Sequence, residues 1–141
     1  MMTAKEYLQQ IYHLDRKIKR LEAKREAIRA DLYSVKSTTD YNRDKVQTSV
    51  EGDTMLRLIA KVDSIERDII AELNQLISLK DKISRQIESV QNEKQKAVLF
   101  RRYVLCERWE QIAVDLNVSV RYVYMIHGEA LQYFAKYILK I

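Results

Sequence analysis

The sequence predicts an all-α protein, in which a long helical hairpin of the antiparallel coiled-coil type is followed by a small three-helix domain. Three observations favour this fold class. The 141 residues include no proline and only two glycines, so little material is present for tight turns. Apolar residues recur at steps of three and four through residues 7–35 and 55–90, which is the spacing of a coiled-coil seam. After residue 91 this period gives way to shorter helical patterns.

The first seam predicts a helix from Ala4 to Lys36. Thr3 and Glu6 have the spacing of a capping box, in which each side chain accepts a hydrogen bond from the other residue's backbone amide. This pair would begin the helix. The apolar positions that follow are Tyr7, Ile11, Leu14, Ile18, Leu21, Ile28, Leu32 and Val35.

The second seam predicts a helix from about Thr54 to Gln91, with Asp53 as its N-cap. Residues 37–52 are polar and have no apolar period, so we expect a linker or disordered loop that lets the two helices fold back on each other. The seam residues are Met55, Leu58, Val62, Ile65, Ile69, Leu73, Leu76, Leu79, Ile83, Ile87 and Val90. One partner helix covers such stripes only in part, so we favour a homodimer through the hairpin over a bundle within a monomer.

Residues 92–141 predict a separate domain, and residues 1–91 the hairpin. Asn92 has the position of an N-cap that Gln95 would reciprocate, and Ser119 that of a second N-cap. The residues on both sides of Ser119 have the pattern of a helix-turn-helix, with Ala113 as the small residue that allows a close crossing and Val118 at the turn. The side chains expected to fill the interface are Ile112, Leu116, Val123 and Ile126.

The segments 99–105, 109–113, 116–119 and 123–131 resemble region four of the sigma-70 family of transcription factors, which reads promoter DNA. The opening residues 2–8 are similar to those of small phage-encoded proteins that carry such a region at the C-terminus. The resemblance implies a phage or prophage transcriptional regulator in a bacterial host cytoplasm. The recognition helix departs from the sigma pattern at Val120, Tyr122 and Tyr124, where sigma factors carry charged residues. Promoter-element recognition therefore does not carry over.

By position, the resemblance implies a set of base-proximal residues: Val120, Arg121, Tyr122, Tyr124 and Met125. We expect Arg121 to contact a base, because a guanidinium pairs with the two acceptors of guanine; a solvated arginine is the alternative. Tyr122 and Tyr124 are expected to hydrogen-bond phosphates or pack on thymine methyls; the alternative is that one of them covers the core. Phosphate contacts are expected from Lys94, Lys96, Arg101, Arg102, Arg108 and Ser119, although some of these would simply be solvated. Trp109 is expected to anchor the core.

Charge and composition limit the classes of function that the sequence favours. The formal charge is +5, and residues 92–141 hold eight Lys or Arg against five Asp or Glu, a net of +3, which suits a polyanionic partner. His13 and His127 lie in different predicted helices, and Cys106 is the single cysteine. We therefore expect no enzyme, no metal and no cofactor. No apolar run approaches a membrane span, and we expect a cytoplasmic protein.

The sequence is consistent with three functional hypotheses. The leading hypothesis is sequence-specific binding of double-stranded DNA, as a dimer. The second is an adaptor that contacts RNA polymerase or another regulator through the same domain. The third is a small-terminase-like packaging protein, which would form a ring.

Overall fold

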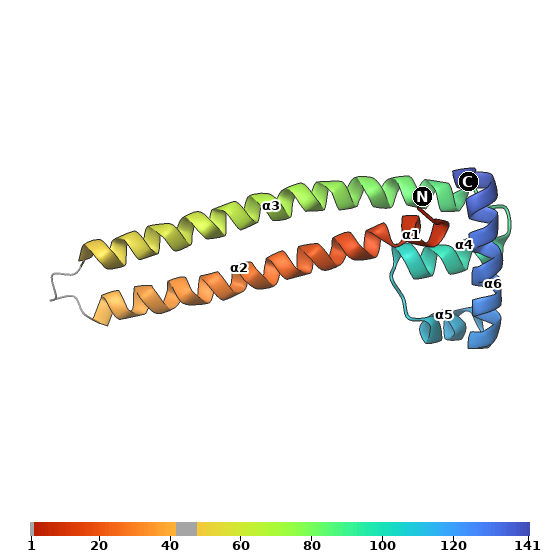
Figure 1. Ribbon diagram of the computed structural model, residues 1–141. Coiled ribbons are helices and arrows are strands. Elements are labelled where there is room, and N and C mark those ends of the chain that lie inside the picture. Colours follow the sequence, from red (N-terminus) through yellow and green to blue (C-terminus); the bar gives the residue numbers. More distant parts are fainter. Residues whose placement is uncertain (1, 42–47) are drawn as a thin grey trace. The chain divides into compact units, whose positions relative to one another are not determined.

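The computed structural model describes residues 2–41 and 48–141, and within them every regular element is helical and none is a strand. The predicted all-α class is confirmed. The elements in Figure 1 are α1 (Ala4–Leu8), α2 (Gln10–Tyr41), α3 (Thr48–Glu88), α4 (Glu93–Leu99), η1 (Phe100–Val104), α5 (Trp109–Leu116), α6 (Val120–Tyr133) and η2 (Phe134–Leu139). In the described residues, no helix is both long enough and apolar enough to cross a membrane.

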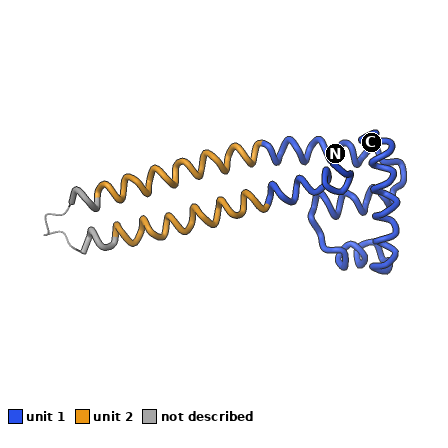
Figure 2. The backbone as a smooth tube through the Cα atoms, in the orientation of Figure 1, with its two compact units in different colours: residues 1–15, 75–141 blue, residues 16–74 orange. Residues whose placement is uncertain are grey.

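The chain divides into two compact units (Figure 2). Unit 1 consists of residues 1–15 and 75–141, and unit 2 of residues 16–74. Both borders fall inside the long helices α2 and α3. Residues 75–91 thus group with the C-terminal helices, whereas the sequence analysis places its domain boundary at residue 91.

In unit 2 the parts of α2 and α3 within residues 16–74 lie side by side and antiparallel (Figure 1). The predicted seams supply its buried side chains, Ile18, Ile65 and Ile69. Ion pairs link the helices: Lys17 Nζ lies 2.7 Å from Glu72, and an Arg29 nitrogen lies 2.6 Å from Glu66. Other seam positions are half-buried, among them Leu21, Ile28, Leu32, Met55, Leu58 and Val62.

The helix bounds differ from the predicted ones at several points. The capping box of Thr3 and Glu6 is present, but the predicted single helix 4–36 is interrupted at Gln9, whose amide donates to the carbonyls of both Lys5 and Tyr7. The helix then continues to Tyr41. Leu8 and Ile11, on either side of this turn, are fully buried, and tertiary packing of this kind overrides helix propensity.

The second long helix begins earlier than predicted. It starts at Thr48 and ends at Glu88 rather than Gln91, so Asp53 lies inside α3 and is not its N-cap. The predicted loop 37–52 is therefore helical at both ends, and residues 42–47 lie outside the described residues. Helix propagation adds one hydrogen bond per residue, so a polar segment beside a long helix extends it at little cost.

Unit 1 buries most of the core. Its largest fully buried side chains are Leu8, Ile11, Ile83, Ile87, Val90, Val98, Leu99, Ile112, Val123 and Phe134. Asn92 caps α4 as predicted by accepting from the Gln95 amide. Gln95 does not reciprocate, because its Oε1 atom is buried without a hydrogen-bond partner among the described residues.

Two helices of unit 1 end in π-helical turns, which the sequence analysis did not predict. α4 runs on into η1, where the Leu105 amide donates to the Phe100 carbonyl five residues earlier (3.1 Å). α6 runs on into η2 in the same way. Cys106, two residues after the end of η1, lies in the left-handed region at φ 56°. A π turn rotates the residues that follow it around the helix axis. In η1 this rotation comes just before the segment that leads to α5.

Candidate nucleic-acid interface

The turn between α5 and α6 has a well-defined local cause. Asn117 adopts φ 56° and ψ 46°, a left-handed conformation that asparagine tolerates better than most residues. Its amide donates to the Val114 carbonyl (3.1 Å), and the next amide, of Val118, donates to the Ala113 carbonyl (3.0 Å). These two bonds form a Schellman motif. Ser119 then caps α6 as predicted, because its Oγ accepts from the Tyr122 amide (3.1 Å).

A packed cluster fixes α5 against α6. Its buried members are Val98, Ile112, Ala113, Val123 and Ile126, and half-buried Trp109, Leu116, Val118, Val120 and Tyr122 pack against them. The four residues predicted to fill this interface are all included. Ala113 is only 4% exposed, and its small side chain permits the close approach of the two helices. α4 supplies Val98, so three helices share this core.

The five predicted base-proximal residues fall into two groups. Tyr124 and Met125 are about half exposed, at 49% and 51%, and Arg121 is also exposed. Val120 and Tyr122 are half-buried and pack against the core cluster. Of the two tyrosines, Tyr122 is therefore the one that covers the core.

Two of the predicted phosphate-binding cations already contact carboxylates. Lys96 Nζ lies 3.2 Å from Glu93 and 3.6 Å from Glu88. The hydrogen bond to Glu93 raises the pKa of Lys96 above its usual value. Arg101 lies 2.8 Å from Asp115 and 3.4 Å from Glu107. A phosphate would have to compete with these carboxylates for the same cation.

The other predicted cations lie on aromatic rings or in solvent. The Arg102 guanidinium stacks over the Trp109 ring at 4.4 Å and donates to the Glu107 carbonyl (2.9 Å). Lys94 Nζ lies over the Tyr122 ring at 5.4 Å. Arg108, which precedes α5, is exposed. These contacts hold Lys94 and Arg102 in place while leaving their charge unneutralised.

An aromatic cluster beside this face was not predicted. His127 Nε2 and the Tyr103 hydroxyl are joined by a 2.6 Å hydrogen bond, and their rings stack at 5.6 Å. The Trp109 ring meets His127 edge-on at 4.6 Å and Tyr124 at 5.2 Å. Tyr103 and His127 are 24 residues apart, and no spacing rule links such positions.

Burial governs the protonation of this cluster. The pKa of His127 is lowered to about 4, mainly by desolvation and to a lesser extent by the positive charges of Lys5 and Arg102. Desolvation likewise raises the pKa of Tyr103 to about 12, against a smaller opposing effect of Arg102. Both groups are neutral at pH 7, so the cluster supports Trp109 and Tyr124 without adding charge to the surface.

Gly128 lies in α6, next to this cluster in sequence. A Cβ atom added there would meet nothing within 4 Å, so packing inside the described part of the chain does not require glycine. The conformation does not require it either, because no glycine has a positive φ. Neither side-chain packing nor backbone conformation within the described residues therefore accounts for this glycine.

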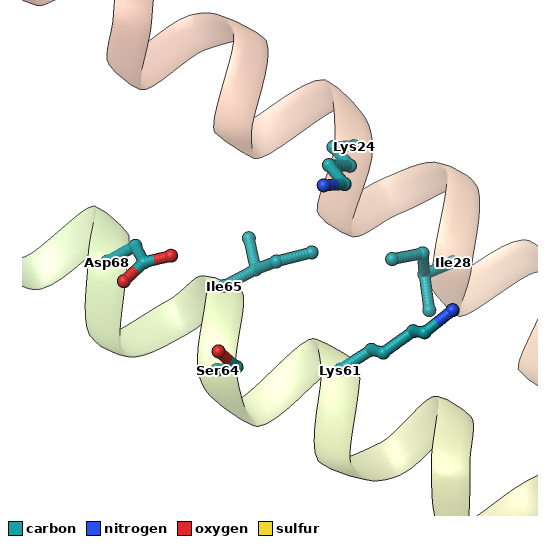
Figure 3. Close-up of a pocket in the computed structure, with 6 residues that line it drawn as sticks. All are labelled: Lys24, Ile28, Lys61, Ser64, Ile65 and Asp68. Carbon is teal, nitrogen blue, oxygen red and sulfur yellow. The ribbon is translucent and has the colours of Figure 1, made fainter.

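In unit 2 an open groove of about 240 Å³ lies between α2 and α3 (Figure 3). It is lined by Lys24, Ile28, Lys61, Ser64, Ile65 and Asp68. The groove lacks a nucleophile paired with a base. Among the described residues, no group of three or more His, Cys, Asp or Glu side chains is placed to hold a metal ion.

Comparison with known proteins gives one result. Neither the curated proteins nor the solved structures include a match to this chain. A family model described as "Protein of unknown function (DUF1492)" matches residues 32–135. This segment covers well over half of the 141 residues, including α3 to α6. The chain therefore belongs to the DUF1492 family.

Proposed function

We propose that this protein binds double-stranded DNA in a sequence-specific manner and acts as a transcriptional regulator of the phage type. In this proposal α5, the turn at Asn117 and α6 form a helix-turn-helix, and α6 enters the major groove. The observation that carries the proposal is the division of α6 into two faces. Val123, Ile126 and Ala130 are buried in the core, whereas Arg121, Tyr124 and Met125 face outward.

The chemistry of the outward face suits base reading. A guanidinium at Arg121 forms two parallel hydrogen bonds to guanine, and apolar groups such as the Met125 side chain pack on thymine methyls. The ring of Tyr124 is held by Trp109 at 5.2 Å, which limits its loss of freedom on binding. Readout from a helix fixed by its core is more precise than readout from a loop.

Phosphate contacts would come from the cations that no carboxylate neutralises. Lys94, Arg102 and Arg108 meet this condition in the contacts described above, whereas Lys96 and Arg101 are paired with acids. We therefore assign the first three to the DNA backbone and give the other two a structural role. Ser119, which caps α6, places the first amides of this helix where a phosphate binds favourably.

The test is selection of bound sequences from a random pool of duplex DNA, at two salt concentrations. We expect one enriched motif, and we expect Arg121→Ala to weaken its binding by about tenfold or more, since a bidentate base contact contributes about 1–3 kcal/mol. Arg57→Ala is the matched control, because Arg57 is an exposed arginine in α3. Weak binding to every sequence that disappears with salt would contradict sequence-specific readout.

An adaptor that contacts RNA polymerase or another regulator is the second candidate. It is favoured by Val114 on α5, which is 73% exposed, because a large exposed apolar residue suits a protein partner. Val114→Asp separates the two candidates. If α6 reads DNA, Val114→Asp should leave DNA binding nearly unchanged. If the protein is an adaptor, Val114→Asp should abolish binding of the protein partner, and Arg121→Ala should leave that binding intact.

A further inference from the structure

The long helix α3 carries a second apolar stripe that α2 does not cover. Its members are Leu56 (67% exposed), Ile59 (47%), Ile70 (58%) and Leu73 (37%). The sequence analysis placed Leu73 on the α2-facing seam, and its exposure corrects that prediction. The stripe lies one residue after the α2-facing positions, and thus about 100° around the helix from them. Four large apolar side chains remain open to water within unit 2.

The order of residues along this stripe is a palindrome. Read in either direction, it is Leu, Ile, acid, acid, Ile, Leu, at steps of three, four, three, four and three; the acids are Asp63 and Glu66. These steps are those of the a and d positions of a coiled coil. A twofold interface needs a surface complementary to itself, so that residue i of one copy meets residue j of the other and the reverse. The palindrome provides this match between two antiparallel α3 helices.

The two acidic residues at the centre of the stripe are compatible with such a pairing. Asp63 lies 3.0 Å from an Arg67 nitrogen, and Glu66 lies 2.6 Å from an Arg29 nitrogen. Each copy would therefore bring two carboxylates and two guanidinium groups to the centre, so the centre carries no net charge. Charged groups that are paired before association lose less on desolvation than isolated ones.

A charge beside the stripe favours one relative direction of the two α3 helices. Arg67 follows Glu66 at an e position, which flanks the a and d positions of the stripe. About the same centre, antiparallel helices bring Arg67 within one residue of the level of Asp63 in the other copy, whereas parallel helices place Arg67 beside Arg67 and Asp63 beside Asp63. Antiparallel helix dipoles add to this preference.

We infer that this stripe binds a second copy of the chain, with the two α3 helices antiparallel. Leu56 of each copy packs on Leu73 of the other, and Ile59 packs on Ile70. Such an interface closes after two copies, so it produces a dimer and not a ring. The inference goes beyond the proposed DNA binding and does not depend on it.

The first test is the molar mass of the protein over a range of concentrations. We expect the wild type to reach twice the mass of one chain, and Ile70→Asp to weaken the dimer by more than about tenfold, because it buries two unpaired carboxylates per dimer. Ile77→Asp is the matched control. Ile77 is also an exposed isoleucine of α3, at 64%, but it lies outside the palindrome and would meet Gly52.

The inference is overturned if the wild type stays monomeric at high concentration, which would mean that the stripe binds something else or nothing. It is also overturned if Ile77→Asp is as damaging as Ile70→Asp, since another register would then hold. Both positions are exposed, so circular dichroism should show unchanged helix content.

The second test is disulfide trapping in a Cys106→Ser background. With both Leu56→Cys and Leu73→Cys, the two positions face each other across the interface, and oxidation should join two chains. With Leu56→Cys alone, the two thiols would be 17 residues apart along the axis, about 25 Å at the helical rise, which is too far for a disulfide. Rapid bonding of the single variant would show parallel helices and contradict the inference.

Discussion

In residues 16–74 two long helices meet along one seam, whereas in residues 75–141 short helices cover one another's apolar faces. The buried hydrophobic side chains described in unit 2 are Ile18, Ile65 and Ile69, while the core of unit 1 has many more members. The elements of unit 1 also begin and end at specific caps, at Asn92 and Ser119. Short helices are marginal alone, so the C-terminal region depends on both caps and packing. The long helices of unit 2 need only their apolar seam to stay paired.

The largest expected effect is loss of a core side chain from the C-terminal region. Ile112 is fully buried between α5 and α6, so Ile112→Ala should lower the free energy of unfolding by about 3–4 kcal/mol. Ile69→Ala in unit 2 should cost about 2 kcal/mol, because a seam of two helices collapses or admits water more easily. Urea unfolding measures both, with Trp109 fluorescence for unit 1 and circular dichroism for all helices. Equal losses of unfolding free energy in the two variants would refute the contrast between the two units.

The contrast also explains what could be predicted from the sequence. Thr3, Asn92 and Ser119 were recognised as caps because a cap is a local pattern of side chain and backbone. The cluster around Ile112 and Val123 was recognised because apolar spacing reports a buried face. In the long helices the same spacing gave the α2-facing seam correctly at Ile65 and Ile69.

What could not be predicted depends on contacts between distant residues. The ion pairs of Arg101 with Asp115 and Glu107 require the α5 helix to fold beside η1, so the sequence analysis assigned Arg101 to phosphate. The bond between Tyr103 and His127 has the same origin. The start of α3 at Thr48 rather than after Asp53 was missed for another reason, because cap residues also occur inside helices and propensity is a weak guide.

The second prediction concerns pH and should affect only unit 1. Burial lowers the pKa of His127 to about 4, against about 6.5 in the unfolded chain. Between these values the unfolded state binds more protons, so stability should be full above pH 6.5 and fall as the pH drops toward 4. Partial exposure of the ring limits the loss to about 1–2 kcal/mol.

The measurement for this prediction is the free energy of unfolding between pH 4 and 7. His127→Gln should remove most of the pH dependence in that window. His13→Gln is the control, because His13 is exposed in α2. An unchanged slope in the His127 variant would show that other groups cause the dependence.

A third prediction concerns an effect that should be equal in both regions. Gly52 and Gly128 both lie inside helices, and an added Cβ would meet nothing within 4 Å at either. Gly128→Ala and Gly52→Ala should therefore each stabilise the protein by about 1 kcal/mol, the difference in helix propensity. Thermal unfolding of the two variants checks this. Destabilisation of one would reveal a packing constraint that the chain alone does not show.

The smallest expected effect is that of one ion pair between the long helices, Lys17 with Glu72. Lys17 and Glu72 lie 2.7 Å apart, and their side chains are 52% and 17% exposed. Such a pair contributes only about 0.2–1 kcal/mol, because water screens the charges and ordering the lysine costs entropy. A double-mutant cycle with Lys17→Ala and Glu72→Ala isolates this energy, and it should shrink as salt is added. If the coupling instead exceeded about 2 kcal/mol at high salt, unit 2 would depend on its ion pairs more than on its apolar seam, and the contrast with unit 1 would have to be restated in terms of charge.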